Sequence, residues 1–242
     1  MNTETRQIKV GGLVVDVVRK DIKNLHLAVY PPAGRVRVAV PLRVSDEAVR
    51  LAVVTRLAWI KRQQGKFKGQ ERQSEREYVT GESHYFLGHR YRLKVVCQDG
   101  PQHVLVRNNR TIHLLVREGS TRPQRERVLL EWYRHQLKIM IPPLLERWEL
   151  ILGVKVSAWG VKQMKTKWGT CNVEAGRIWV NLELAKKPVQ CLEYIVVHEL
   201  VHFLERHHND RFTGLMDKFL PSWRMQREIL NQAPLGHENW DY

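Results

Sequence analysis

The stretch His198-Glu199-Leu200-Val201-His202 decides how this sequence is interpreted, because it has the form HExxH. On an α-helix, residues four apart lie on one face about one turn apart, so the two imidazoles can reach one cation. Glu199 is rotated away from this pair but lies next to it, where it can contact a water rather than the cation itself. The pattern predicts a Zn²⁺ site with two neutral nitrogen ligands and Glu199 as the general base.

A solvent-exposed helix face with two incidental histidines is the alternative interpretation of this motif. The residues around it argue against that interpretation, because Ile195, Val196, Val197 and Phe203 give the helix a largely apolar character. Histidine and glutamate side chains buried in such a helix would lack polar partners unless something binds them. The apolar context therefore favours the metal site.

A catalytic zinc site normally has a third protein ligand and one open position. The candidates that follow the motif are Glu205, His207, His208 and Asp210. On an uninterrupted helix, both His207 and His208 would point away from the ligand face. Asn209 or Asp210 can cap a new helix, and a chain reversal there would return one imidazole to the metal. This geometry modestly favours His208 over His207.

The order of sequence patterns predicts an α+β fold with a β-rich N-terminal portion, residues 1–119, and a C-terminal catalytic portion, residues 120–242. Apolar and polar residues alternate in short runs before residue 45 and again between residues 85 and 116, which is typical of strands. Helical spacing follows from Ser120, and Pro142-Pro143 should break or kink that helix. No internal repeat is visible. The remaining expected elements are a hairpin over 161–182, a helix from Cys191 to about Arg206, and a last helix over 210–231 that Pro221 interrupts.

Several segments resemble the YgjP-like metallopeptidases, relatives of the SprT and WLM groups of short zincins. The HExxH motif with His208-Asn209-Asp210-Arg211-Phe212 resembles that family's HELxH…HsxxF pattern, and Lys165–Cys171 resembles its T-R-W-G-S-C element. Lys167, Thr170 and Asn209 replace the usual Arg, Ser and Ser, which are mild departures. The resemblance also takes in residues 78–91 and 178–197, and thus most of the chain. It implies a small zincin-like catalytic portion, in which His198, His202 and His208 hold Zn²⁺ and Glu199 is the catalyst.

The candidate substrate-binding residues are less specific, and each has a structural alternative. Trp168 and Trp179 would line a pocket or pack around the active helix, and Asn181 would bind substrate or tie the strand to the helix. Residues 177–182 are the candidate strand for pairing with an extended peptide. Cys171 is interpreted as a small packed residue rather than a reactive thiol or a metal-masking ligand. A second group that stabilises an oxyanion would come from His207, Arg211 or Lys167, and Arg211 is also a candidate substrate contact.

The composition of the 242 residues argues against a disordered chain or a disulfide scaffold, with 43% hydrophobic residues and three cysteines. No apolar run approaches the ~20 residues that a membrane span needs. The first six residues are polar and contain no secretion signal, so a cytoplasmic, membrane-free protein is expected.

The formal charge of +15 is unevenly distributed along the chain. From Val189 to Tyr242, five Lys+Arg stand against eight Asp+Glu, a net charge of −3 that leaves +18 on residues 1–188. The densest basic run lies between Arg56 and Arg76. It predicts either a solvated face or a contact with an anionic partner such as a nucleotide or nucleic acid.

These observations favour a zinc-dependent hydrolase that cleaves peptides or proteins. One alternative keeps the site and changes the substrate, because the family resemblance includes a nucleotide (UTP) pyrophosphatase. A second alternative is a DNA-associated accessory protease of the SprT kind, whose basic residues 1–119 would dock on nucleic acid. The sequence does not determine the oligomeric state.

Overall fold

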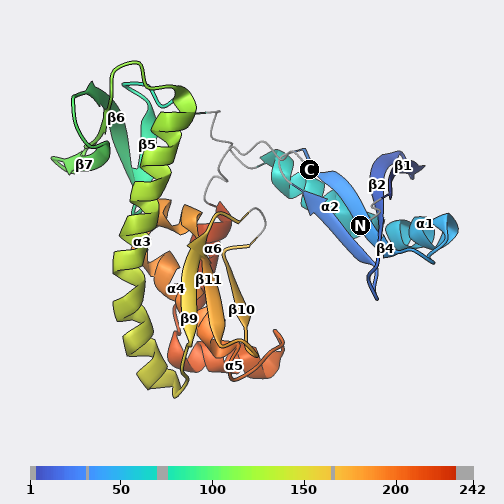
Figure 1. Ribbon diagram of the computed structural model, residues 1–242. Coiled ribbons are helices and arrows are strands. Elements are labelled where there is room, and N and C mark those ends of the chain that lie inside the picture. The colour runs from blue at the N-terminus through green and yellow to red at the C-terminus, as the bar shows by residue number, and fades with distance from the viewer. Residues whose placement is uncertain (1–3, 31–32, 70–75, 165–166, 233–242) are drawn as a thin grey trace. The chain divides into compact units, whose positions relative to one another are not determined.

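In the computed structural model, which describes residues 4–30, 33–69, 76–164 and 167–232, the chain falls into two compact units, within Met1–Gln73 and Ser74–Gly236 (Figure 1). The predicted α+β class is confirmed. The division of the chain falls between residues 73 and 74, whereas the sequence predicted a boundary between residues 119 and 120. The difference arises because Ile112, Leu114 and Val116 share one hydrophobic core with the helices that follow.

The first unit is a four-stranded sheet with two helices. Its strands have the order β1-β2-β4-β3, with β2 and β4 parallel and the other pairs antiparallel. Gly11 and Gly12 have φ values of 55° and 81°, which suit the two-residue turn between β1 and β2. The elements are β1 (Glu4–Val10), β2 (Leu13–Lys20), β3 (His26–Tyr30), β4 (Arg35–Pro41), α1 (Asp46–Thr55) and α2 (Leu57–Gly69). Arg72, part of the basic run expected from the sequence, lies outside the described residues.

The second unit begins with a sheet of the same topology. Its strands have the order β5-β6-β8-β7, again with a parallel central pair and antiparallel outer pairs. The elements are β5 (Ser83–Phe86), β6 (His89–Cys97), β7 (His103–Arg107), β8 (Thr111–Val116) and the following helix α3 (Arg122–Leu152).

This match of topology is an internal repeat that the sequence did not reveal. Val17 pairs with Val38 across the central strands of the first unit, and Leu93 pairs with Ile112 at the equivalent place in the second. All four side chains are buried. The repeat was missed because such positions require an apolar side chain rather than one residue type.

Helix α3 continues through Pro142-Pro143, where the sequence predicted a break or kink. Each proline removes a backbone donor, at a cost of roughly 3 kcal/mol in a helix interior. Ile141 and Leu145, on either side of the prolines, are buried in the main core together with Leu137 and Trp148. Burying such a stripe of large side chains stabilises the helix enough to offset that cost.

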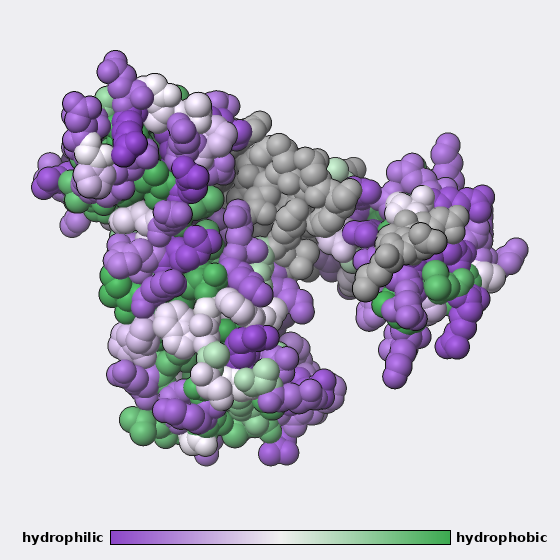
Figure 2. All heavy atoms as spheres, in the orientation of Figure 1, coloured by the Kyte–Doolittle hydropathy of each residue, from purple (hydrophilic) through white to green (hydrophobic). Residues whose placement is uncertain are grey.

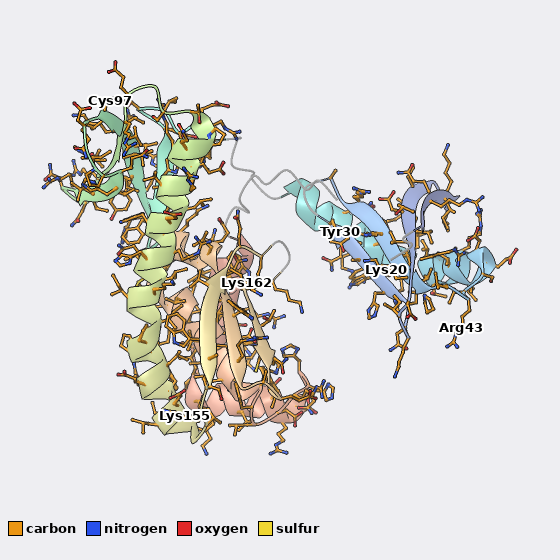
Figure 3. All side chains as sticks on the ribbon, in the orientation of Figure 1. Lys20, Tyr30, Arg43, Cys97, Lys155 and Lys162 are labelled. Atoms are coloured by element: carbon orange, nitrogen blue, oxygen red, sulfur yellow. The ribbon has the colours of Figure 1, made fainter. Side chains whose placement is uncertain are left out.

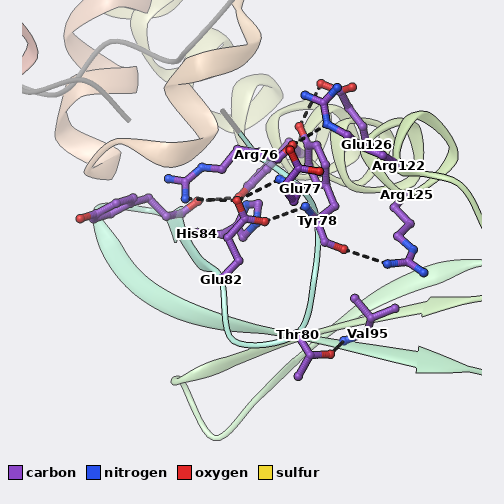
Figure 4. A network of polar contacts seen from close by, with 12 residues as sticks. Arg76, Glu77, Tyr78, Thr80, Glu82, His84, Val95, Arg122, Arg125 and Glu126 are labelled. Carbon is purple, nitrogen blue, oxygen red and sulfur yellow. Dashed lines mark hydrogen bonds and ion pairs between the residues drawn. The ribbon is translucent and has the colours of Figure 1, made fainter. Parts of the chain in front are cut away.

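A network of polar contacts attaches the start of the second unit to α3 (Figure 4). The Tyr78 hydroxyl donates to Glu126 at 2.9 Å, and the Tyr78 backbone N–H donates to Glu82 at 2.8 Å. Glu82 also lies 3.2 Å from Nε2 of His84 and 3.5 Å from the Arg76 guanidinium. The buried ring of His84 is therefore held among the residues that fix the sheet on the helix.

The remaining elements form a three-stranded sheet, a short 3₁₀ helix and three α-helices. Its strand order is β10-β11-β9. The prediction that residues 177–182 offer a free edge is wrong, because β11 is hydrogen-bonded on both sides and the edge strands are β10 and β9. The elements are β9 (Ala158–Lys162), β10 (Gly169–Asn172), β11 (Arg177–Asn181), the 3₁₀ helix η1 (Leu182–Lys186), α4 (Val189–Val201), α5 (Asp210–Phe219) and α6 (Trp223–Gln232). Within the described ranges, no helix is both long and apolar enough to cross a bilayer.

Candidate active site

Helix α4 carries His198 and Glu199 in its last turn. The helix is almost wholly buried, with Leu192, Val196 and Leu200 in the core of the second unit. It ends at Val201, earlier than the predicted Arg206, and His202 is its C-cap residue with helical dihedral angles. His198 and His202 therefore keep the spacing of one helical turn, although α4 ends between them, at Val201.

A chain reversal returns His208 to this pair. The backbone N–H groups of Phe203 and Leu204 bond to carbonyls three residues earlier, which tightens the last turn of α4. The Asn209 side chain then accepts a hydrogen bond from the Phe212 N–H at 2.9 Å and caps α5. Of the two predicted candidates for the cap, Asn209 and Asp210, the structure has Asn209, so the new helix starts directly after His208 and Asn209.

The three histidines converge on one point. One nitrogen of each imidazole of His198, His202 and His208 lies within 4.8 Å of the others. His198 and His208 approach most closely, with their Nε2 atoms 3.0 Å apart. The Phe212 ring packs against all three imidazoles, at centroid distances of 5.0, 4.8 and 4.7 Å. This apolar backing fixes the ring orientations on the side away from the cavity.

The protonation states suit metal binding. Burial, followed by the proximity of His202 and His208, lowers the pKa of His198 to about 3, so its ring is neutral at ordinary pH. Nδ1 of His202 lies 3.2 Å from the Glu205 carbonyl oxygen, which can only accept. That contact places the proton on Nδ1 and leaves Nε2 free as a ligand. Three neutral imidazoles fit a zinc ion with a further open position.

Glu199 lies beside the triad and is 4% exposed. Burial raises its pKa to about 8, and the Lys167 ammonium acts in the opposite direction. The carboxylate is packed against β10, where an added Cβ on Gly169 would lie 2.5 Å from the Glu199 Oε1 atom. Gly169 is thus a site residue that sequence reasoning did not single out, since only its turn-forming character was apparent.

The triad and Glu199 open into a cavity of about 730 Å³ between β10, α4 and α6. Three basic side chains line it, namely Lys167, Arg206 and Arg227. Arg227, on α6, is close enough to help lower the pKa values of His198 and His208, although burial is the larger cause in both. Sequence reasoning missed Arg227, because only the packing of α6 against α4 brings it to the metal site.

Of the four candidate substrate-binding residues, only one lines the cavity in the part of the chain that the structure describes. Trp168 lines the cavity, but Trp179, Asn181 and Arg211 are not among its described lining residues. The Lys162 ammonium lies 3.8 Å from the centroid of the Trp179 ring. Arg211 is exposed, 3.9 Å from the Glu205 carboxylate.

The hydrogen bonds of Asn181 are structural, although they join the strand end to residues 164–167 and to η1 rather than to the HExxH helix as one alternative expected. Its amide donates to the carbonyls of Met164 and Lys167, both at 2.7 Å. Its oxygen accepts from the backbone N–H groups of Met164 and Glu183. The side chain thereby ties the end of β11 to the segment that carries Lys167 into the cavity.

Cys171 lines the cavity from β10. Burial and then the nearby Glu199 raise the pKa of its thiol to about 11, so the thiol stays protonated. This fits its interpretation as a small packed residue. Of the three groups considered for stabilising an oxyanion, Lys167 lines the cavity, whereas His207 and Arg211 are absent from its described lining.

Among known proteins, the chain is similar to one family of metallopeptidases over most of its length. The model of the YgjP-like metallopeptidase domain matches residues 23–233 of the chain. Among solved structures, a metallopeptidase zymogen of Pyrococcus abyssi, abylysin, is 24% identical, with a TM-score of 0.32, over 36% of this chain and 85% of that one. No curated protein matches the chain.

Proposed function

Because the chain belongs to the YgjP-like metallopeptidase family, we propose that it is a zinc-dependent hydrolase that cleaves peptide bonds. His198, His202 and His208 would hold the zinc, and Glu199 would act as the general base. The convergence of three imidazole nitrogens within 4.8 Å, beside a buried carboxylate, carries this proposal. It is the donor set of a catalytic zinc site, with three protein ligands and an open position.

When bound, zinc would acidify a water, polarise the scissile carbonyl and, through its charge, favour the ionised form of Glu199. Glu199 would accept the proton of the attacking water and pass it to the nitrogen of the leaving amine. The buried position of Glu199 suits this exchange, since an environment that raises its pKa brings it close to neutral pH.

The edge strand β10 would hold the peptide. Thr170 and Asn172 belong to this strand, which lines the cavity beside the metal ligands and has β11 on its other side only. An extended peptide can add to such an edge through backbone hydrogen bonds. Because the bond donors are backbone groups, this mode would tolerate many substrate sequences, and Trp168 would supply an apolar contact.

A second candidate activity, hydrolysis of nucleoside triphosphates such as UTP, is supported by the charges around the cavity. Lys167, Arg206 and Arg227 line it, against the two acidic residues Glu174 and Glu199. Guanidinium and ammonium groups bind phosphate oxygens strongly where water is partly excluded. The same metal site and the same general base would then serve a phosphoanhydride.

One experiment tests both candidates. Purified protein is analysed for metal and is assayed for cleavage of denatured casein. A separate assay with UTP measures the release of pyrophosphate. Glu199→Gln should keep a stoichiometric zinc and lose at least about 100-fold in turnover, whereas His208→Ala should lose the metal. Full turnover in Glu199→Gln would overturn the mechanism, and the ratio of casein to UTP hydrolysis decides between the substrates.

A further inference from the structure

The outward side of the β5–β8 sheet carries a concentration of positive charge. Side chains alternate along a strand, and Tyr91 and Leu93 of β6 point into the core. Arg90, Arg92 and Lys94 therefore point the other way, and all three are exposed. We define the basic sheet face by its cationic and imidazole side chains, Arg90, Arg92, Lys94, Arg107 and His113. The four strands contain no Asp or Glu.

These side chains lie next to one another across the strands. Lys94 is directly opposite His113 on β8, and His113 is opposite Leu105, two residues from Arg107. After burial, the charges of Lys94 and Arg107 are the next causes that lower the pKa of His113. Like charges at neighbouring positions of a sheet destabilise it. The stability of the fold therefore does not explain why these basic side chains lie together.

No described element of the second unit covers the basic sheet face. Helix α3 packs on the opposite side of the sheet, through the core that contains Leu114 and Leu129. Hydrophilic side chains gather over these strands at the upper left of Figure 2. In the part of the chain that the structure describes, Arg90, Arg92, Lys94 and Arg107 take part in no ion pair. Their charges are thus available to an external anion.

The repeated sheet of the first unit has a similar charge balance on its corresponding side. Lys9, Lys20, Arg35 and Arg37 alternate with the buried valines of their strands. The single carboxylate among them, Asp16, is buried and accepts hydrogen bonds from Gln7 and Arg35. Two sheets of one topology thus combine an apolar inner side with a net positive outer side, although their outer residues differ in type.

We propose that the basic sheet face binds single-stranded nucleic acid. Its Arg and Lys side chains would contact successive phosphates, and Tyr85 and His113 offer rings against which unstacked bases can pack. A broad four-stranded sheet does not enter the grooves of B-form DNA, which admit a helix or a two-stranded ribbon. An open single strand can follow the whole face. The basic sheet face is separate from the metal site, so this binding would hold the proposed hydrolase on the nucleic acid without occupying its active site.

The test measures binding of a fluorescein-labelled 20-nucleotide single strand to the full-length protein by anisotropy, from 50 to 300 mM KCl. The variant Arg92→Gln/Lys94→Gln/Arg107→Gln should bind at least about tenfold more weakly at 100 mM salt. Its slope of log K against log[salt] should be shallower by about 2, which corresponds to three lost phosphate contacts. Because these side chains are exposed and their like charges repel, the variant should keep its circular dichroism spectrum and should melt at the same or a higher temperature.

The matched control removes the same number of charges elsewhere on this unit, in Lys138→Gln/Lys155→Gln/Lys218→Gln. Lys155 follows the end of α3 that is remote from the β5–β8 sheet (Figure 3). This control should bind within about twofold of the unmodified chain, and Glu199→Gln should bind equally well. Equal weakening of test and control variants would overturn the proposal, as would no binding at 50 mM salt. Tighter binding of duplex DNA or of a polyglutamate chain at equal charge would also overturn it.

Discussion

Gly169 and Glu199 are packed so closely that a Cβ atom on Gly169 would lie 2.5 Å from Oε1 and 2.9 Å from Cδ of Glu199. The edge strand β10 can therefore approach the catalytic helix only because residue 169 lacks a side chain. This contact fixes the position of the carboxylate relative to the metal ligands. The lack of a side chain at Gly169 thus determines how closely β10 packs against Glu199, which its place beside a hairpin turn did not indicate.

Gly169→Ala should reduce turnover about 100-fold while the zinc content stays unchanged. The added methyl group would push the Glu199 carboxylate aside, and a displacement of about 1 Å can cost this much in a positioned catalytic group. Hydrolysis rates and metal analysis of the same preparation measure the two effects. Gly214→Ala is the control, because a Cβ there meets nothing within 4 Å. An active Gly169→Ala variant would refute the role of this contact.

Asn181→Ala should lower the free energy of unfolding by about 3 kcal/mol. The variant would remove the four hydrogen bonds of the buried Asn181 side chain, each of which contributes about 0.5–1.5 kcal/mol. Urea denaturation followed by tryptophan fluorescence would measure this change. Asn172→Ala, which removes an exposed hydrogen bond to the Ala175 N–H, should cost less than about 1 kcal/mol. Equal effects of the two substitutions would contradict the prediction.

The part of the site that the sequence predicted depends on local geometry. The spacing of His198 and His202 follows from the helical period, and a helix cap at Asn209 or Asp210 follows from residue type. The remainder depends on long-range packing. The order of the strands makes β10 an edge strand, and the packing of α6 places Arg227 at the cavity. Neither feature leaves a periodic signal in the sequence. The domain boundary differed for the same reason, since a shared core is not visible in local patterns.

Arg227→Gln should weaken competitive inhibition by inorganic phosphate about tenfold. Arg227 lines the cavity near His198 and His208, and a charge-assisted hydrogen bond to a phosphate oxygen is worth roughly 1.5–3 kcal/mol. The inhibition constant is measured against whichever substrate the enzyme turns over. Arg224→Gln, which removes a cation of the same helix that pairs with Asp217, should leave inhibition unchanged. Unaltered inhibition in Arg227→Gln would exclude a contact between Arg227 and the anion.

The stability of the second unit should depend on pH through His84. Burial, partly opposed by the neighbouring Glu82 carboxylate, lowers the pKa of His84 to about 4 from an ordinary value of 6.5. Between these two values the unfolded chain binds a proton that the folded chain excludes, so the free energy of unfolding falls as the pH decreases from about 6.5 to about 4. The full effect is on the order of 3 kcal/mol. Above pH 6.5 both states are neutral at this site, and the contribution of His84 no longer changes with pH.

His84→Gln removes the titrating group, so the dependence of unfolding free energy on pH should become shallower between pH 4 and 6.5, even though the variant is less stable throughout. Urea unfolding curves at half-unit pH intervals measure this slope. His135→Gln, an exposed position on α3, is the matched control and should retain the slope of the unmodified chain. If the slope survived in His84→Gln, the acid sensitivity would have to come from other groups. The buried imidazole between Tyr78 and Glu82 would then be a purely structural contact.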